Sequence, residues 1–261
     1  MIEPERAAAA ADLLARHRDQ GTRLDSLPAD IRPHSREEGY AVQSQWMRHT
    51  GRPLYGWKIA ATSEAGQRHI NVKGPMAGRL LAERVLPDGA TIALAGNLMR
   101  VVELELAFRM ARNLPPRARP YSVEEVLAAV ETLHPALEIP DSRYQDFVAA
   151  GEAQLIADNA CAHLFILGPA VPGEWRGVDL AAYTVSATVG GRRHDGRGAN
   201  VLGDPRIALA WLANELRDLG ITLGAGECVT TGTCVVPIAI APGDHVHADF
   251  GAFGEMSARF S

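Results

Sequence analysis

Cysteine is scarce in this sequence, and it does not occur in a pattern that would hold a disulfide framework or a structural zinc ion. The three cysteines, Cys161, Cys228 and Cys234, are odd in number and include no CxxC pair. We therefore expect each of them to be a small, partly buried apolar residue.

Long apolar runs are also missing. No uninterrupted hydrophobic stretch in the 261 residues approaches the roughly 20 that a membrane-spanning helix needs. The N-terminal segment is rich in alanine but contains Glu3, Glu5, Asp12 and Asp19, and such acidity is atypical of secretory and transit peptides. The sequence therefore predicts a cytoplasmic protein with no membrane partner.

An excess of positive charge is the third absence. The formal net charge is −5, which gives no electrostatic reason to expect nucleic acid or an anionic membrane as a partner. An anionic substrate would need a local positive centre, such as a metal ion or a well-placed Lys or Arg. The hydrophobic fraction of 47% and the charged fraction of 22% are those of an ordinary soluble globular protein.

Helix caps and turn residues divide the chain into a helical segment, 1–50, and a β-rich domain, 51–261. Pro4 and Gly21 bound a first helix, and Ser35 caps a second. Beyond this segment short strands and turns dominate, without strict alternation of strands and helices. We expect an α+β fold with a large mixed or antiparallel sheet and a helical N-terminal segment.

The remaining expected elements follow from hydrophobic periodicity and turn signals. The expected strands are 54–60, 91–96, 101–110, 134–140, a hairpin around 183–191, and strands near 228–231, 235–240, 245–250 and 255–260. The expected helices are 122–133, 152–163 and 204–220.

The segment 101–110 carries the most informative pattern. Glu103 and Glu105 share one face of the expected strand, with Cβ atoms roughly 7 Å apart, while the opposite face is wholly apolar. Two such carboxylates in a central strand are costly unless a cation or hydrogen bonds compensate them. Glu138 lies alone in another apolar segment, HPALEIP. If the three carboxylates converge, they form a hard oxygen site suited to Mg²⁺ or Mn²⁺.

The pattern alone leaves a second interpretation open, in which Glu103 and Glu105 lie on the wet face of a half-exposed strand. Likewise, His245, His247 and Asp249 share one strand face and resemble a transition-metal pattern, but a solvated face is the favoured interpretation there.

The segment GWKIAATSEAGQRHI offers further polar candidates. Lys58 would be solvated on an edge strand, but if it points inward it could bind a carboxylate or transfer a proton. Thr62 and Ser63 could face an anion, although plain capping of the next turn is favoured by the local sequence. Thr233, in VTTGTCVVP, offers a hydroxyl beside a glycine, and this signal is weak.

Six segments, taken together, resemble the fumarylacetoacetate hydrolase superfamily, in particular its 2-oxopent-4-enoate (2-hydroxypentadienoate) hydratase and 4-oxalocrotonate decarboxylase branch. They follow the family's order and span nearly the whole chain from about residue 35; the E-x-E strand with the later LEIPDSR glutamate is the most specific. The resemblance implies a β-rich fold of the hydrolase C-terminal-domain type. The segments are GWKIAATSEAGQ, VVELELAF, ALEIPDSRY, ADNACAHLFILG, VTTGT and DHVHADFGAFGEMSARF.

The resemblance also implies a site and a function. It implies a divalent-metal-dependent hydratase acting on 2-oxopent-4-enoate or a related small 2-oxo or 2-hydroxydienoic acid in the catabolism of aromatic compounds, assembled as dimers or multiples of dimers. The alternatives are a 4-oxalocrotonate-type 2-oxo-3-enedioate decarboxylase, or a non-catalytic subunit that associates with such an enzyme. The implied residues are Glu103, Glu105 and Glu138 for the metal, Lys58 for catalysis, and Thr62, Ser63 and Thr233 for substrate binding.

The sequence departs from the family pattern in one place. Hydratases of this branch carry an acidic D-F/Y-G tripeptide where this chain has Met76, Ala77 and Gly78. A methionine cannot transfer protons, so water addition would need another base. The chain also lacks the N-x-x-H-x-x-E segment of the longer hydrolases, which argues against hydrolysis of a carbon–carbon bond.

Overall fold

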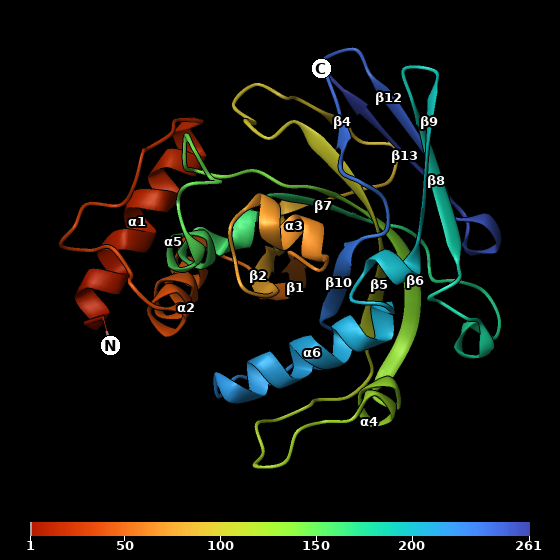
Figure 1. The fold of residues 1–261 in the computed structure, drawn as a ribbon, viewed down its shortest axis with the longest axis horizontal. Coiled ribbons are helices and arrows are strands. Elements are labelled where there is room, and N and C mark those ends of the chain that lie inside the picture. The colour runs from red at the N-terminus through yellow and green to blue at the C-terminus, as the bar shows by residue number, and fades with distance from the viewer. Residues whose placement is uncertain (1) are drawn as a thin grey trace.

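Two β-sheets organise the chain in the computed structural model, which describes residues 2–261 (Figure 1). The larger sheet mixes parallel and antiparallel pairs, as expected. Its order from edge to edge is β2 (Met76–Leu81), β1 (Leu54–Ala60), β10 (Cys228–Thr233), β5 (Val101–Met110), β6 (Val130–Ile139), β7 (Leu164–Leu167) and β3 (Val85–Leu86), with β11 (Ile238–Ala239) paired to β5. The smaller sheet runs β4 (Thr91–Ile92), β13 (Glu255–Phe260), β12 (His245–Asp249), β8 (Thr184–Val189) and β9 (Arg192–Arg197).

The helices begin and end at the caps that the sequence provides. Ser35 accepts a hydrogen bond from the Glu38 N–H at the start of α2, and Gly21 ends α1 with a left-handed φ of 63°. The α-helices are α1 (Pro4–Gln20), α2 (Arg36–Ser44), α3 (Glu64–His69), α4 (Val123–Leu127), α5 (Glu152–Ala157) and α6 (Pro205–Asp218). Short 3₁₀ turns cover Gln45–His49, Ala82–Arg84, Asn159–Cys161, Trp175–Gly177, Gly198–Asn200 and Gly251–Phe253.

The central strand β5 is buried on both faces. One face, which includes Leu104 and Phe108, belongs to the main hydrophobic core. On the other face Ala107 packs with Ala136 and Phe165 in a smaller cluster. Hydrogen bonding to β10 on one side and β6 on the other leaves β5 no free edge. Glu105 on this strand therefore lies inside the protein, while Glu103 and Arg109 are half-buried.

The N-terminal helices lie to one side of the sheets beside α5 (Figure 1). The alanine face of α1 and Trp46 form a hydrophobic cluster with Leu81, Tyr144 and Ala157 from the rest of the chain. The helical segment thus packs directly onto the β-rich part, and a domain boundary at residue 50 stays a prediction. Within residues 2–261 no helix has the length and apolarity to cross a membrane.

Four expected elements are wrong in extent, one of them the strand expected over 235–240, which is limited to Ile238–Ala239 and pairs with β5. The helix expected over 122–133 ends at Leu127, because Val130 starts β6 and pairs with Met110 along β5. The helix expected over 152–163 ends at Ala157, and the backbone turns left-handed two residues later, at Asn159. The strand expected over 91–96 is limited to its first two residues, which pair in parallel with β13. In each case a tertiary contact overrides the local propensity.

Candidate metal centre

Four adjacent strands, β1, β10, β5 and β6, direct polar side chains to one place. Glu103 on β5 lies directly opposite Glu138 on β6, and Glu105 follows on the same face of β5. Lys58 on β1 lies opposite Thr230 on β10. The sheet therefore gathers one basic and three acidic side chains from segments that are far apart in the sequence.

The three carboxylates converge as the sequence analysis anticipated. One oxygen from each of Glu103, Glu105 and Glu138 lies within 4.8 Å of the others. Glu105 and Glu138 are 0% exposed. The alternative interpretation, in which Glu103 and Glu105 lie on a solvated strand face, is therefore wrong for Glu105, while Glu103 is half-buried.

Glu105 is held in place by β10. Its Oε2 accepts hydrogen bonds from the Thr230 hydroxyl and, at 2.8 Å, from the Gly232 N–H. The donor N–H sits where the β10–β5 register shifts, and Gly232 adopts a φ of +102° that favours glycine. A Cβ at this position would lie 2.2 Å from the Thr62 Oγ1. The bulge thus fixes one oxygen of Glu105 and leaves Oε1 without a hydrogen-bond partner among residues 2–261.

Lys58 is the basic side chain of the site, and it is only 3% exposed. Its Nζ lies 3.1 Å from Glu138 Oε1 and donates a hydrogen bond of 3.3 Å to the Ala160 carbonyl oxygen. Burial lowers the pKa of Lys58, but the charges of the surrounding carboxylates outweigh it, so the pKa is raised. The ammonium group therefore stays charged, and it offsets only part of the acidic charge.

The pKa values of the three carboxyl groups are raised, because burial and mutual repulsion outweigh the charge of Lys58. Burial and the neighbouring Glu138 raise the pKa of Glu103 to about 7. Burial, Glu138 and Glu103 raise the pKa of Glu105 well above its usual value, and burial raises that of Glu138 despite Lys58. Glu138 Oε2 is a further buried oxygen without a hydrogen-bond partner in the described chain. Hard oxygen ligands with unsatisfied lone pairs fit a divalent cation such as Mg²⁺ or Mn²⁺.

The three residues expected to contact the substrate, Thr62, Ser63 and Thr233, differ in what they contact in the structure. Thr62 is buried against Gly232, the residue whose N–H donates to the Glu105 carboxylate. The Ser63 hydroxyl accepts from the Gly66 N–H at 3.0 Å and caps α3. The Thr233 hydroxyl donates to the Val235 carbonyl oxygen at 2.8 Å, within its own turn. Substrate binding by these three residues stays a prediction, and of the three Thr62 is the buried one, packed against the glycine that donates to Glu105.

Two neighbours of the carboxylate site could not be found from the sequence. Thr230 precedes the quoted glycine turn, and only the pairing of β10 with β5 shows that its hydroxyl meets Glu105. The Ala160 carbonyl has no side-chain signal at all. In contrast, His245 and His247 are exposed on β12 and belong to no metal-binding cluster within residues 2–261, which agrees with the favoured solvated face.

The departure at Met76 lies beside the site. Met76 begins β2, pairs with Ala60 and is 1% exposed. Two residues on, Gly78 lies opposite Lys58, where a Cβ would meet the Lys58 Cγ at 3.0 Å and the Asn159 carbonyl oxygen at 2.5 Å. The glycine of the family tripeptide is thus required by packing against the lysine, while the acidic position holds an apolar side chain.

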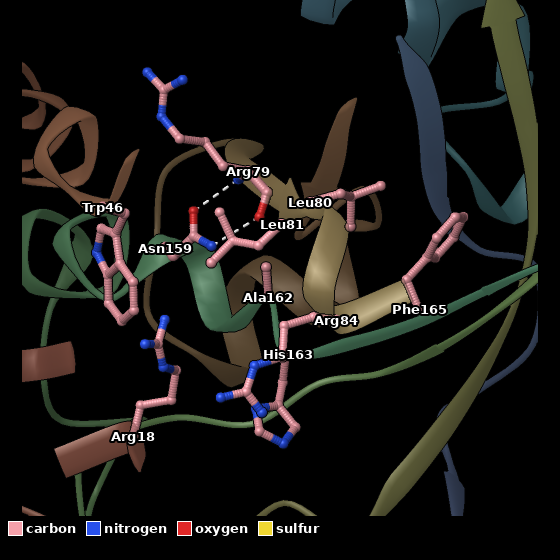
Figure 2. Close-up of a pocket in the computed structure, with 10 residues that line it drawn as sticks. All are labelled: Arg18, Trp46, Arg79, Leu80, Leu81, Arg84, Asn159, Ala162, His163 and Phe165. Atoms are coloured by element: carbon pink, nitrogen blue, oxygen red, sulfur yellow. Dashed lines mark hydrogen bonds between the residues drawn. The ribbon is translucent and has the colours of Figure 1, made fainter. Parts of the chain in front are cut away.

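A small pocket is lined in part by Asn159, Ala162 and His163, at and just after the 159–161 turn (Figure 2). Its volume of about 10 Å³ has room for a single water molecule, too little for an organic substrate. His163 points into it near Arg18 and Arg84 (Figure 2). Burial, followed by the charges of Arg143, Arg84 and other arginines, lowers the pKa of His163 to about 3. His163 is therefore neutral in the folded protein at pH 5, where it would be protonated in the unfolded chain.

We expect His163 to destabilise the protein as the pH falls. Between pH 6.5 and pH 3 the unfolded state binds a proton that the folded state does not, so stability is lost on acidification. The wild type should therefore lose about 2 kcal/mol more than His163→Gln between pH 7 and pH 5. Urea unfolding of both proteins at the two pH values measures this difference. Comparing the two cancels the titration of the glutamates, and parallel losses would contradict the prediction.

A family profile, two sequence relatives and one solved structure each resemble this chain over most of its length. Residues 59–261 match the sequence profile of the fumarylacetoacetate (FAA) hydrolase C-terminal family. The chain is 32% identical over 265 residues to 2-oxo-hept-4-ene-1,7-dioate hydratase of Escherichia coli, covering 95% of this chain and 97% of that protein. It is 31% identical over 263 residues to 2-keto-4-pentenoate hydratase of Paraburkholderia xenovorans (strain LB400), covering 99% and 96%. The solved structure of 4-oxalocrotonate decarboxylase from Pseudomonas putida G7, complexed with magnesium and adipate, matches with a TM-score of 0.91 and 27% identity over 100% of this chain and 99% of that chain.

Proposed function

Because this chain belongs to the fumarylacetoacetate hydrolase family, we propose that it is a divalent-metal-dependent hydratase, a lyase, acting on 2-oxopent-4-enoate or a related small 2-oxo acid. The observation that carries the proposal is the convergence of three carboxylates beside a buried lysine. The relatives that match along nearly the whole chain are hydratases of such substrates. We place the reaction in the catabolism of aromatic compounds.

We propose that Glu103, Glu105 and Glu138 hold Mg²⁺ or Mn²⁺. When bound, such an ion supplies Lewis acidity toward the carboxylate and 2-oxo oxygens of the substrate. The solved decarboxylase structure that contains magnesium supports the choice of a hard cation. The hydrogen bonds from Thr230 and Gly232 hold Glu105 in its ligating position before the ion arrives, which avoids reorganisation at the moment of reaction.

Lys58 is the proposed catalytic residue. Its ammonium group lies at the edge of the carboxylate cluster, where it can orient a substrate carboxylate or pass a proton to the reacting carbon skeleton. Thr62 is proposed to line the substrate site, because it is packed against the glycine that holds Glu105. Ser63 and Thr233 are proposed as further contacts to the substrate, through hydrogen-bonding capacity that their local hydrogen bonds do not use.

Decarboxylation is the second candidate reaction. The apolar Met76 at the acidic position of the hydratase tripeptide favours it, since loss of CO₂ does not require that acid to deliver water. The structural match to a 4-oxalocrotonate decarboxylase supports the same alternative. Both reactions pass through a 2-enolate that a Lewis acid and a nearby ammonium group would stabilise.

The test is product analysis with purified protein, Mg²⁺ or Mn²⁺, and each of two substrates. Incubation with 2-hydroxypenta-2,4-dienoate should yield 4-hydroxy-2-oxopentanoate, and chelation should abolish the product. Release of CO₂ from 2-oxo-3-hexenedioate without any hydration would instead establish the decarboxylase. No turnover of either substrate alone, with activity restored by a co-purified relative, would indicate a non-catalytic subunit.

The assembly and location are part of the proposal. We propose a homo-oligomer, a dimer or a multiple of dimers, possessing no nucleic-acid or membrane partner and located in the cytoplasm. Light scattering of the purified protein tests the assembly, and a monomer would contradict it.

A further inference from the structure

The backbone next to Lys58 contains three consecutive left-handed residues that are not glycine. Asn159, Ala160 and Cys161 have φ values of 56°, 50° and 61°. Each residue with a Cβ is disfavoured in this region, and runs of such residues are rare. A turn of this kind persists only where the surrounding structure holds it.

The side chain of Asn159 holds the turn to strand β2. The Arg79 N–H donates to Asn159 Oδ1 at 2.7 Å, and Asn159 Nδ2 donates to the Arg79 carbonyl oxygen at 2.8 Å (Figure 2). Because β2 is an edge strand of the larger sheet, the amide takes the two backbone positions that a further strand would otherwise pair with. Asn159 is 2% exposed, so solvent cannot replace these bonds.

The left-handed turn, residues 159–161, contacts Lys58 at two points. The Ala160 carbonyl oxygen accepts the hydrogen bond from Lys58 Nζ. Gly78, next to Arg79 on β2, leaves just enough space for the Lys58 stem beside the Asn159 carbonyl oxygen. A shift of the turn relative to β2 would therefore move the acceptor of the ammonium group and change the space around its stem together.

We propose that Asn159 is a positioning residue that fixes Lys58 by clamping the left-handed turn to β2. The inference rests on the proposed function, in which Lys58 is catalytic. It assigns Asn159 no contact with the substrate or the metal ion. Its effect passes through the Ala160 carbonyl oxygen and the packing around Gly78.

The chain provides a matched control for this clamp. Asn214, on α6, makes the same pair of hydrogen bonds with the backbone of Tyr121, with its Oδ1 2.8 Å from the Tyr121 N and its Nδ2 3.0 Å from the Tyr121 O. Helix α6 contributes no residue to the metal centre. Asn159→Asp and Asn214→Asp each replace the amide nitrogen with an oxygen and keep the side-chain shape. Asn214 is half-buried, and its Nδ2 also donates to the Ala210 carbonyl oxygen at 2.9 Å.

Steady-state kinetics of the metal-loaded enzyme provide the first readout. Asn159→Asp should lower kcat about 30-fold, because a displacement of about 1 Å at a catalytic group can cost up to 100-fold. The KM and the Mn²⁺ dissociation constant should change less than about threefold, since the carboxylates stand on the central strands. Asn214→Asp should lower the melting temperature but leave kcat per folded molecule unchanged. A neutral variant, Asn159→Gly, which accepts the left-handed φ, should repeat the loss and exclude an effect of the added charge.

Lysine NMR provides a readout that does not depend on turnover. The chain has only two lysines, Lys58 and Lys73, so protein labelled with [¹³Cε]lysine gives two signals. The Lys58 signal should move in Asn159→Asp and Asn159→Gly, while that of the exposed Lys73 should not. Neither signal should move in Asn214→Asp.

The outcomes separate the inference from the proposed function. An inactive wild type would overturn the function, and the Lys58 signal would still decide whether Asn159 positions the lysine. Active Asn159 variants with wild-type kcat and an unmoved Lys58 signal would overturn the inference. If Asn159→Asp does not fold, Asn159→Gly carries both measurements.

Discussion

Replacing Glu138 with glutamine should reduce kcat/KM by about 1,000-fold or more, roughly 4 kcal/mol of transition-state stabilisation. Glutamine keeps the shape of the side chain but removes one of three charges that the site offers to a divalent cation. Affinity for Mn²⁺ should fall at least about 100-fold, because even outer partners of metal ligands are worth 10- to 100-fold. Isothermal titration with Mn²⁺ and assay at saturating metal measure the two effects separately.

A matched substitution on the same strand controls for general damage to β6. Glu131 is exposed near the start of this strand, and Glu131→Gln should leave metal affinity and turnover unchanged. If Glu138→Gln bound Mn²⁺ as tightly as the wild type, the assignment of Glu138 as a metal ligand would be wrong. The same result with lost activity would move Glu138 from metal binding to acid–base chemistry.

Replacing Lys58 with methionine should lower the stability of the metal-free protein and increase the stabilisation that added Mg²⁺ provides. Removing the one ammonium group that pairs with the buried carboxylates costs about 3 kcal/mol, which corresponds to a fall in Tm of about 6 to 12 °C without metal. Added Mg²⁺ should then raise the Tm more in the variant than in the wild type, because the carboxylates have no other cation. Turnover at saturating Mg²⁺ should fall about 100-fold, within the range of general acid–base catalysis.

Lys73→Met is the natural control, since Lys73 is the other lysine of the chain and is exposed. It should change neither the Tm nor turnover. Calorimetric scans with EDTA and with Mg²⁺ provide the comparison. An equal response of Lys58→Met and the wild type to Mg²⁺ would mean that the ammonium group and the cation do not share the same carboxylates.

The carboxylate site was predictable from sequence because its signal is local. An E-x-E pattern inside an apolar strand places two carboxylates on one face whatever the rest of the fold does. Glu138 required more, because its meeting with Glu103 depends on the β5–β6 register. Here the resemblance to a family supplied what periodicity could not, and the structure brings the three residues together.

Other features depended on contacts that no local pattern records. Val130 and Leu133 fit a helical stripe, yet they belong to β6, because pairing along the full length of β5 outweighs a short helix. The turn at Asn159 gave no signal beyond the tolerance of asparagine for left-handed backbone. Thr230 was passed over because its role depends on a bulge between two strands distant in sequence.

The face-to-face placement of Glu103 and Glu138 has a consequence for how the chain folds. The two residues stand on antiparallel neighbours joined by the long 111–129 connection, and a slip of one residue would turn one carboxylate to the opposite face of the sheet. An alignment shifted by one residue could not bring the two carboxylates to one ion. A cation bound during folding would then stabilise the native pairing of β5 and β6 relative to a pairing shifted by one residue, before the rest of the sheet forms around it.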